Sequence, residues 1–483
     1  MMNSEKIQSC LDRLLEQHRV PSVSVSIYHE GRYTLFQAGC KDLENKNPAA
    51  ADTMYAIGSC SKSFTAAAVC VLADQGLVNL DAPVKQYIPE FEMYDSYVST
   101  HLTVRDMLCH RCGLPRHELA WYPRLDTYKE ADMINMFRHL KPSQPFRYKM
   151  QYQNQMFALA GFLIQRVSGL TWKDFLQKYL AEPMGFGKIA YDAPELAAAS
   201  DYACGYRYDY KSGTLNQVPY ATLNTMQAAG SLSMTSGQLA AWNVMLMSHG
   251  EYNGKQILSP EMCKEMTSPQ MLISDPVLKP LEGHLRNQSY GLGLFLEDYK
   301  GTPVVQHGGH IDGFIADMCF APALDFACAV LTNAENPVAG RAVRYSLLDM
   351  LIGSESEDWV KVLADVLAET REKAELTPLP PSDSQAPCPV PLSHICGEYA
   401  NPGYGDLIVS HKDGKLEAKL GTLTLTGHHR RNQHFIFTEE HVLPGEQLEG
   451  LIQLDVEGNV TSLDIALDGS SKEKIVFARI QNK

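Results

Sequence analysis

Apolar and polar positions alternate with two different periods along the 483 residues. The stretches SVSVSIYH and RYTLFQAG, within residues 21–40, have the period of two that predicts an antiparallel hairpin. Further strands are predicted near 302–308, 313–321 and 325–333, and a helix at about 340–353. The residues between have mostly helical periodicity. We therefore expect an α+β fold, in which the early hairpin joins the late strands in an antiparallel sheet flanked by helices, with a mostly helical subdomain inserted.

The pattern changes near the C-terminal side of this unit. Residues 355–375 predict an exposed amphipathic helix, and the proline-rich stretch TPLPPSDSQAPCPVPLS that follows predicts a stiff linker. After it, short alternating segments separated by turn sequences such as KDGK and EGN predict about eight strands, typical of a small all-β antiparallel barrel. We expect three parts: a first domain at 1–355, the helix and linker at 356–391, and the barrel domain at 392–483.

A long apolar run begins directly after the letters SCSK, which start at Ser59, and it predicts a helix. Ser59 and Lys62 are three residues apart, so on a helix their side chains share one face. A serine hydroxyl becomes a nucleophile when a neighbouring base takes its proton, and a lysine can be that base when burial or nearby positive charge lowers its pKa. The pattern is loose, however: Ser471 and Lys474 form a second match in a polar stretch that predicts a turn.

Two other short motifs supply chemistry. YQN at 152–154 puts a phenol and an amide at the start of another apolar helical run. HGG at 307–309 ends a predicted strand, where glycines let a ligand lie against the backbone. Each motif has a second match elsewhere. Tyr399 begins the second match to the YQN motif, and we interpret it as a core residue of the C-terminal domain. His29 begins the second match to the HGG motif, and we interpret it as a residue of a hairpin turn.

Taken together and in this order, the motifs resemble those of the penicillin-recognising serine hydrolases, which share the β-lactamase fold. Longer segments extend the resemblance. LTVRDMLCHRCGLP at 102–115 is similar to the family's TvrdLLtHtSGLp segment, AGSLSMT at 229–235 to its segment before a helix, and QGLVNLDAPV at 75–84 to the stretch after the nucleophile helix. The resemblance covers about residues 5 to 355.

This resemblance implies a role for each matched residue. Ser59 matches the serine that is acylated, Lys62 the lysine that shares its proton, and Tyr152 the tyrosine that acts as general base and then as acid. Asn154 matches the amide that holds the lysine and the substrate. The backbone N–H groups of Ser59 and His310 would form the oxyanion hole. The substrate-binding residues that the resemblance implies are Asn154, His307, Gly308, Gly309 and His310.

His307 departs from the family pattern, because β-lactamases and DD-peptidases of this type carry lysine there. Lysine is a fixed cation suited to a substrate carboxylate, whereas histidine is neutral or weakly charged near pH 7. Efficient β-lactamase or DD-carboxypeptidase activity is therefore less expected. A His-x-Gly version resembles D-aminopeptidases, related peptidases and some esterases. The other interpretation of His307 is that it packs and bonds only locally.

Composition excludes several classes of function. The net charge of −14 argues against nucleic acid and against an anionic membrane surface. No apolar run is long enough to span a bilayer, and twelve scattered cysteines are typical of buried free thiols in a reducing cytoplasm. Cys109 and Cys112 lack a second pair at zinc spacing. We expect a cytoplasmic protein that needs no metal and no other cofactor.

The function expected is acyl transfer in two steps through an acyl-enzyme on Ser59. The first choice of substrate is an amide or peptide bond in a small molecule or short peptide, with a D-residue or a free amine. Two alternatives stay open: a carboxylesterase or transacylase acting on small esters, and a non-catalytic penicillin-binding-like protein. The C-terminal domain resembles the lipocalin-like domain often appended to this family, which implies a role in homo-oligomerisation or as a wall over the active-site cleft.

Overall fold

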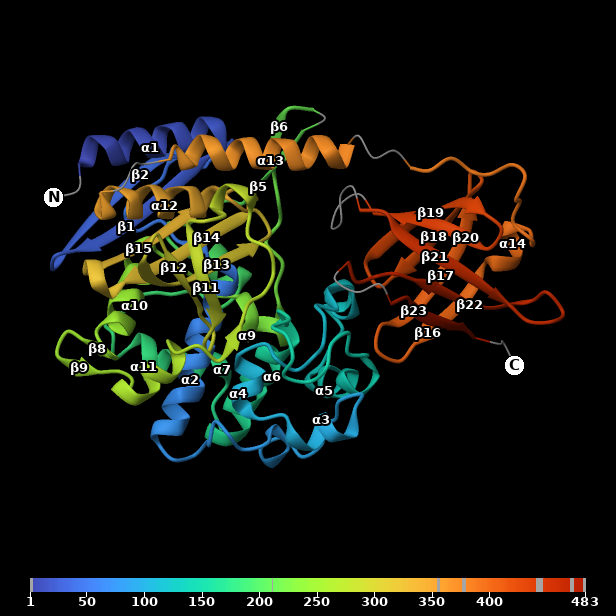
Figure 1. Cartoon of the computed structure of the whole chain (residues 1–483), viewed down its shortest axis with the longest axis horizontal. Coiled ribbons are helices and arrows are strands. Elements are labelled where there is room, and N and C mark those ends of the chain that lie inside the picture. The colour runs from blue at the N-terminus through green and yellow to red at the C-terminus, as the bar shows by residue number, and fades with distance from the viewer. Residues whose placement is uncertain are drawn as a thin grey trace.

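The structure is a computed structural model that describes residues 3–210, 212–353, 357–375, 379–439, 446–469 and 473–480. A large antiparallel sheet with helices forms the N-terminal part of the molecule, and a closed barrel forms the C-terminal part (Figure 1). This arrangement confirms the α+β class and the barrel that the sequence pattern predicts.

Within the described residues, the large sheet has nine strands, and every neighbouring pair is antiparallel. Its strands are β1 Ser22–His29, β2 Arg32–Asp42, β3 Asn47–Pro48, β10 Met271–Leu272, β11 Leu285–Tyr290, β12 Phe295–Tyr299, β13 Thr302–Ile311, β14 Phe314–Ala321 and β15 Phe326–Thr332. Their order is β10-β11-β12-β13-β14-β15-β1-β2-β3. The early hairpin therefore joins the late strands through β1 and β15, with Val23 opposite Thr332.

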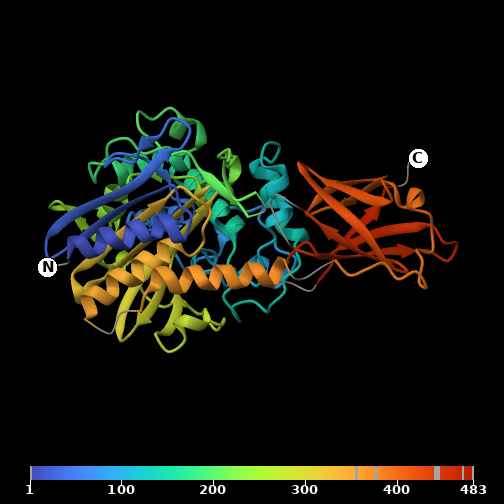
Figure 2. The ribbon, with the colours of Figure 1, turned by 90° about the horizontal axis from the view of Figure 1, so that it is seen from above.

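Three helices cover one face of the sheet: α1 (Ser4–Gln17), α12 (Ala339–Ile352) and α13 (Trp359–Glu375) (Figures 1 and 2). Helix α1 buries Ile7, Leu11 and Leu14, which the helical period places on one side. Helix α13 is amphipathic, as expected, but it is not exposed throughout, because Trp359, Val360 and Leu363 are fully buried in the same cluster. Burial of these side chains fixes the first turns of α13 onto the N-terminal domain.

The opposite face meets α10 (Ser236–Met247) and, beyond it, the helical subdomain. At its centre is α2 (Ser61–Asp74), in which every residue from Ser61 to Leu72 is buried, so the helix has no solvent-exposed face before its last two residues. The other helices are α3 Ser96–His101, α4 Val104–Leu108, α5 Glu130–Met136, α6 Asn154–Ser168, α7 Trp172–Leu176, α8 Ala193–Ala197, α9 Gln227–Gly230 and α11 Pro260–Met266. Small strand pairs join β4 Tyr55–Ala56 to β7 Ser233–Met234, β5 Tyr206–Asp209 to β6 Thr214–Gln217, and β8 Glu251–Tyr252 to β9 Lys255–Gln256.

The C-terminal barrel has eight strands in the part of the chain that the structure describes, and it closes because β16 pairs with both β17 and β23. Its strands are β16 Gly397–Asn401, β17 Gly405–Lys412, β18 Lys415–Leu420, β19 Leu423–Arg431, β20 His434–Thr438, β21 Leu448–Leu454, β22 Val460–Ile465 and β23 Ile475–Arg479, with the short helix α14 Leu392–Ile395 before them. Along β17, Leu407 and Val409 are buried and Ile408 is exposed, which is the alternation expected of a barrel wall. Tyr399 is fully buried in this domain.

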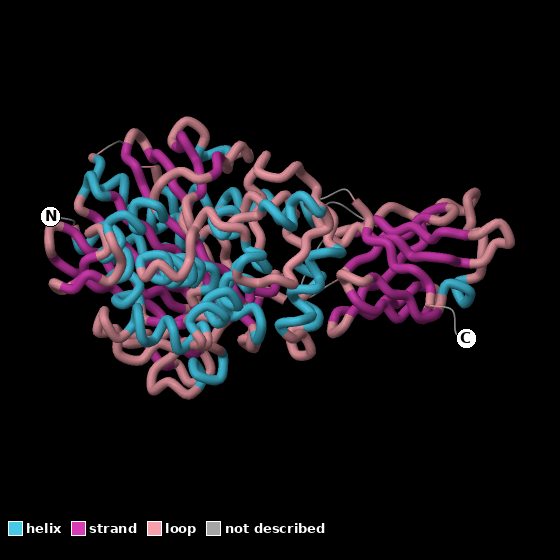
Figure 3. The backbone as a smooth tube through the Cα atoms, turned by 90° about the horizontal axis from the view of Figure 1, so that it is seen from below, coloured by secondary structure: helices cyan, strands magenta, loops and turns pink. Residues whose placement is uncertain are grey.

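The barrel contacts the N-terminal domain at one end (Figure 3). Arg124 donates to the carbonyl oxygen of Gly403 at 2.8 Å, and the N–H of Thr422 donates to that of Pro123 at 2.9 Å. Part of the expected linker is bonded to the barrel: Asp383 donates its N–H to the carbonyl oxygen of Arg430, and Asn432 donates its N–H to that of Ala386. Where one domain ends and the next begins stays a prediction, at the limits 355 and 391 given above.

Candidate active site

Ser59 lies in η1 (Gly58–Cys60), a 3₁₀ turn that runs directly into α2. Ser59 is partly exposed, whereas Lys62, in the first turn of α2, is completely buried. The Nζ atom of Lys62 is 3.0 Å from Oγ of Ser59 and 2.7 Å from the carbonyl oxygen of Ala229. The structure thus brings together the hydroxyl and the amine that the spacing of the motif predicts to share a face.

The surroundings of Lys62 favour its neutral form. Burial lowers its pKa well below the usual value of lysine, the nearby Arg116 cation lowers it further, and the carboxylate of Glu118 acts in the opposite direction. Among the described residues its hydrogen-bond partners are a hydroxyl and a carbonyl oxygen, and neither compensates a positive charge as a carboxylate would. An amine in this state can accept a proton from Ser59.

Tyr152 lies just before α6, with its ring centroid 4.9 Å from Nζ of Lys62. Burial raises the pKa of Tyr152, while the Ser59 hydroxyl and Arg116 lower it. Although Ser59 is near enough to affect this pKa, no atom of the described residues is in hydrogen-bond geometry with the Tyr152 hydroxyl. We interpret this orphaned phenol as directed at a position that a substrate or water would fill.

His110 fixes the backbone on both sides of Tyr152. Its carbonyl oxygen accepts the N–H of Gln151 at 2.8 Å, and its Nδ1 accepts the N–H of Gln153 at 3.1 Å. The His110 ring is fully buried, and its centroid is 4.4 Å from that of Tyr152. Because Nδ1 accepts a hydrogen bond, the neutral ring carries its proton on Nε2. Burial lowers the pKa of His110 well below its usual range, and Lys62 lowers it further.

Asn154, the first residue of α6, faces a carboxylate. Its Nδ2 donates to Oε1 of Glu118 at 2.8 Å, and Arg116 donates to the same oxygen at 2.8 Å. No hydrogen bond between Asn154 and Lys62 is present among the described residues, and the carbonyl oxygen of Ala229 is the neighbour of the amine instead. Arg116 also lies over the Tyr152 ring, 5.1 Å from its centroid. These contacts build a polar wall of Arg116, Glu118 and Asn154 beside the phenol.

Strand β13 approaches the nucleophile so closely that glycine is required on both sides. A Cβ on Gly309 would overlap the carbonyl oxygen of Ile57, and one on Gly58 would lie 2.8 Å from the N atom of His310. Beyond Gln306, β13 pairs with β14 alone in the part of the chain that the structure describes, so β12 does not cover its other edge. The backbone N–H groups of Ser59 and His310 are therefore carried by segments in direct contact, which is the arrangement that an oxyanion hole needs.

His307 is buried and uses both ring nitrogens within the protein. Nδ1 is 2.6 Å from the carbonyl oxygen of Gly308, so it carries the proton, and Nε2 accepts the hydroxyl hydrogen of Tyr290 at 3.0 Å. Burial lowers the pKa of His307 to about 3, with Lys62 adding to the effect. The ring is neutral at physiological pH and offers no cation to a substrate carboxylate.

Several residues of this site were absent from the candidates of the sequence analysis. His110 and Ala229 both lie in segments that carry the family resemblance, so their positions, although not their contacts, were available from the sequence. Glu118 gave no local signal, because it follows a histidine without the second histidine of a zinc-binding helix. Of the matches set aside, Tyr399 lies in the barrel core, and Ser471 lies outside the described residues.

The described residues contain no group of three or more histidine, cysteine, aspartate or glutamate side chains arranged to hold a metal ion. No helix among them combines the length and the apolar character needed to cross a membrane.

Comparison with known proteins assigns the family. The model of the family described as Beta-lactamase matches residues 7–349, which is well over half of the chain. The chain belongs to the Beta-lactamase family. Its curated relatives include "Unguisins hydrolase ungD'" of Aspergillus campestris, 28% identical over 426 residues that cover 84% of this chain and 77% of the relative. "Protein flp" of Staphylococcus aureus is 22% identical over 351 residues, covering 71% of this chain and 66% of that protein.

Solved structures of similar fold cover different shares of the chain. The octameric penicillin-binding protein homologue from Pyrococcus abyssi superposes with a TM-score of 0.64 at 20% identity, covering 98% of this chain and all of that one. The D-amino acid amidase from Ochrobactrum anthropi SV3, complexed with D-phenylalanine, has a TM-score of 0.59 at 23% identity, covering 77% and 99%. At these identities the likeness shows the fold alone.

Proposed function

We propose that this Beta-lactamase family protein is a serine hydrolase that cleaves amide bonds of small substrates bearing a free amine. The observation that carries the proposal is the 3.0 Å distance between Nζ of the buried Lys62 and Oγ of Ser59. An amine whose pKa is lowered by burial is unprotonated for part of the time near neutral pH, and it can then remove the proton of the serine.

In the proposed reaction, Oγ of Ser59 forms a bond to the carbonyl carbon while its proton passes to Lys62. The N–H groups of Ser59 and His310 hold the oxyanion. The bond from carbon to nitrogen then breaks, and the leaving amine takes the proton of Tyr152, whose raised pKa keeps the phenol protonated until that step. Lys62 returns the proton to Tyr152. Water attacks the acyl-enzyme with the same groups acting in reverse, and the pair Lys62–Tyr152 titrates as a unit.

The proposed preference for a free amine rests on the charges of the polar wall formed by Arg116, Glu118 and Asn154. Glu118 is 29% exposed at the side chain, and burial raises its pKa above the ordinary value, with Arg116 acting in the opposite direction. Its Oε1 accepts hydrogen bonds from the Arg116 cation and from Asn154, and these partners suit a carboxylate. A carboxylate beside the reacting carbonyl attracts an ammonium group of the substrate. The neutral His307 supplies no matching attraction for a substrate carboxylate. A relative of similar fold is named a D-amino acid amidase, which agrees with this class of substrate.

A labelling experiment tests the chemistry. The full chain and its Ser59→Ala variant would be incubated with a fluorophosphonate, and intact mass would be measured. We expect one adduct on the wild-type chain and none on the variant. The absence of an adduct on the wild type would favour the non-catalytic alternative.

A substrate comparison tests the class. D- and L-aminoacyl anilides, the same anilides acetylated on the amine, and short nitrophenyl esters would be assayed on one preparation. We expect the free-amine anilides to exceed the acetylated ones about tenfold in kcat/KM, and the Glu118→Gln variant to lose most of this preference. Fast ester cleavage without turnover of any anilide would favour the carboxylesterase alternative.

Assembly and location are further proposals. The Pyrococcus abyssi homologue is described as octameric, which supports a homo-oligomer formed by this chain, with the barrel as the contact. Light scattering on the full chain measures its mass directly. The cytoplasmic location and the lipocalin-like character of the barrel stay predictions.

A further inference from the structure

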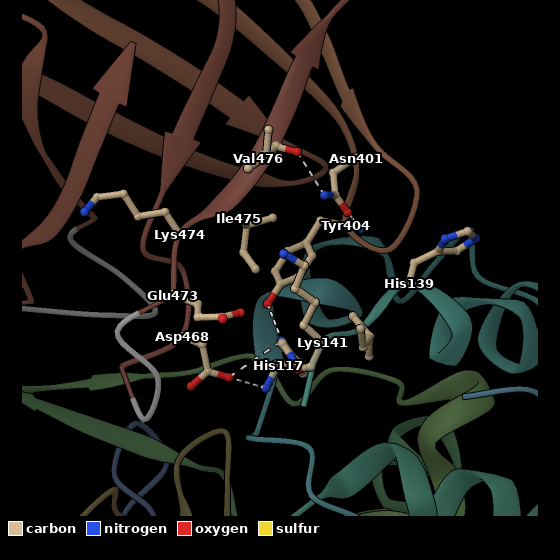
Figure 4. Close-up of a pocket in the computed structure, with 11 residues that line it drawn as sticks. His117, His139, Lys141, Asn401, Tyr404, Asp468, Glu473, Lys474, Ile475 and Val476 are labelled. Carbon is tan, nitrogen blue, oxygen red and sulfur yellow. Dashed lines mark hydrogen bonds and ion pairs between the residues drawn. The ribbon is translucent and has the colours of Figure 1, made fainter. Parts of the chain in front are cut away.

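His117, which comes directly before Glu118, is a buried residue that the barrel contacts. His117 is 3% exposed and has a left-handed backbone, with φ 46° and ψ 40°. Its backbone N–H donates to Oδ2 of Asp468 at 2.6 Å, and its Nδ1 is 2.7 Å from the hydroxyl oxygen of Tyr404 (Figure 4). Tyr404 and Asp468 both belong to the barrel domain.

The hydrogen-bond partners fix the protonation of His117. Nε2 is 3.2 Å from the carbonyl oxygen of Lys141, which can only accept, so Nε2 carries the proton. Nδ1 of the neutral ring is then the acceptor, and the O–H of Tyr404 is the donor. Burial lowers the pKa of His117, with Asp468 acting in the opposite direction, and the neutral form agrees with these contacts.

On its other side, the same segment is bonded to the start of α6. Nε2 of Gln155 donates to the carbonyl oxygens of Arg116 and His117, at 3.1 and 3.0 Å. Nε2 of Gln153 donates to the carbonyl oxygen of Pro115 at 2.8 Å. Residues 115–118 are thus held between the barrel and the three residues that follow Tyr152.

We propose that His117, Tyr404 and Asp468 are positioning residues through which the barrel holds Glu118 beside Asn154. A left-handed backbone at a residue other than glycine persists when its neighbours hold it there. Without the two bonds from the barrel, the segment can relax, and the carboxylate of Glu118 no longer keeps a fixed distance from the substrate. The barrel is then part of substrate recognition although none of its side chains needs to contact the substrate. This inference rests on the proposed role of Glu118 in binding an amine.

The test compares two tyrosines of the barrel in the full chain. Tyr404→Phe removes the O–H that His117 accepts. Tyr399→Phe is the matched control, because Tyr399 is also fully buried and its hydroxyl donates at 2.6 Å to the carbonyl oxygen of Ile395, within the barrel domain. Two quantities are measured for each variant: the ratio of kcat/KM for an aminoacyl anilide to that for its acetylated form, and the deuterium exchange of peptides covering residues 115–118.

We expect Tyr404→Phe to lower the ratio at least fivefold, through KM of the free-amine substrate, and to speed exchange in that segment. Tyr399→Phe should leave both quantities unchanged. If the wild type prefers the free amine and Tyr404→Phe keeps the preference, the inference is wrong. If the wild type shows no preference for the free amine, the proposed role of Glu118 is wrong, and deuterium exchange alone tests whether the barrel positions residues 115–118. Equal exchange in Tyr404→Phe and the wild type would then overturn this positioning, and faster exchange in Tyr404→Phe would support it.

Discussion

Two buried cations of the N-terminal domain, Lys62 and Arg344, show how their neighbours decide what a buried charge does. Both side chains are almost completely inaccessible to solvent. Arg344, on α12, donates to Oδ1 of Asp317 at 3.1 Å and has Oε1 of Glu297 at 3.8 Å. Lys62 has a hydroxyl and a carbonyl oxygen as neighbours. Burial alone disfavours both charges, but of the two, only Arg344 has carboxylates of the described residues within ion-pair distance.

The pKa directions follow from this difference. Burial would lower the pKa of Arg344, yet Asp317, Tyr345 and Glu297 hold it well above its usual value. The pKa of Lys62 is well below its usual value. Arg344 is therefore a permanent charge suited to joining β12, β14 and α12, whereas the neutral amine of Lys62 is suited to the proposed role of a base. A carboxylate within ion-pair distance of Lys62 would have abolished the chemistry proposed for it.

The largest effect is expected for Lys62→Met, which keeps the approximate volume and removes the amine. We expect kcat/KM to fall about 10³-fold or more, because Ser59 loses its base. The free energy of unfolding should change by no more than about 1 kcal/mol, since the lost hydrogen bond to Ala229 is offset by removing a buried polar group. Steady-state assays and urea unfolding measure the two quantities. A loss of stability of several kcal/mol would show that Lys62 is a structural charge like Arg344.

Arg344→Met should do the reverse. It leaves Asp317 and Glu297 buried without their cation, and we expect a loss of about 3–5 kcal/mol in the free energy of unfolding. The folded fraction should keep kcat/KM within a few-fold of the wild type, measured well below the new melting temperature. Arg341→Met, on the same helix, is a control for loss of charge, since Arg341 is exposed. Equal losses for the two variants would contradict the comparison.

The sequence predicts the contacts of Lys62 only where they are local. The spacing of Ser59 and Lys62 places the two groups on one face because three residues make nearly one helical turn, and Gly308-Gly309 predicts a close backbone approach. The contacts of Lys62 with Ala229 and of Asn154 with Glu118 join segments that are far apart in the sequence, so a local pattern of apolar and polar residues does not predict them. The same holds for His117 and Tyr404, which lie in different domains.

The sequence pattern does not predict a strand whose alternation of apolar and polar residues is interrupted. The period of two does not predict β11, because its pairing with β12 shifts register between Arg286 and Ser289, and Asn287 has a positive φ of 52°. An extra residue in a strand reverses the side of the sheet to which the following side chains point, so the alternation is lost from the sequence. Strands β13, β14 and β15 have no such interruption in their pairing, and they lie where the pattern predicts.

Asp317, the carboxylate that pairs with Arg344, makes the stability of the protein depend on pH. Burial raises the pKa of Asp317 to about 6, and Arg344 lowers it only in part, because that guanidinium is shared with Glu297. Since this value is above the ordinary pKa near 3.8, the folded state binds more protons between about pH 4 and pH 6. The contribution of Asp317 is fully present below pH 4 and is lost as pH rises through 6.

We expect this group to remove up to about 3 kcal/mol of stability between pH 4 and pH 6, at about 1.4 kcal/mol per unit of pKa shift. Chemical unfolding of the wild type and of Asp317→Asn at several pH values isolates the effect as the change in their difference. A difference that stays constant over this range would mean that Arg344 keeps Asp317 ionised throughout.

The smallest expected effect concerns His110, whose ring burial keeps neutral and which positions Tyr152 through a hydrogen-bond acceptor rather than a charge. In His110→Asn, Oδ1 takes the place of Nδ1 as acceptor for the Gln153 N–H, and asparagine tolerates the positive φ of 59°. In His110→Phe that N–H is buried without a partner, at a cost of about 1–3 kcal/mol that a shift of the 151–153 backbone relieves. We therefore expect kcat to fall about tenfold in the phenylalanine variant with KM little changed, and the asparagine variant to stay within about threefold of the wild type. If both variants lose activity equally, the ring of His110 contributes by packing on Tyr152 and not by holding its backbone.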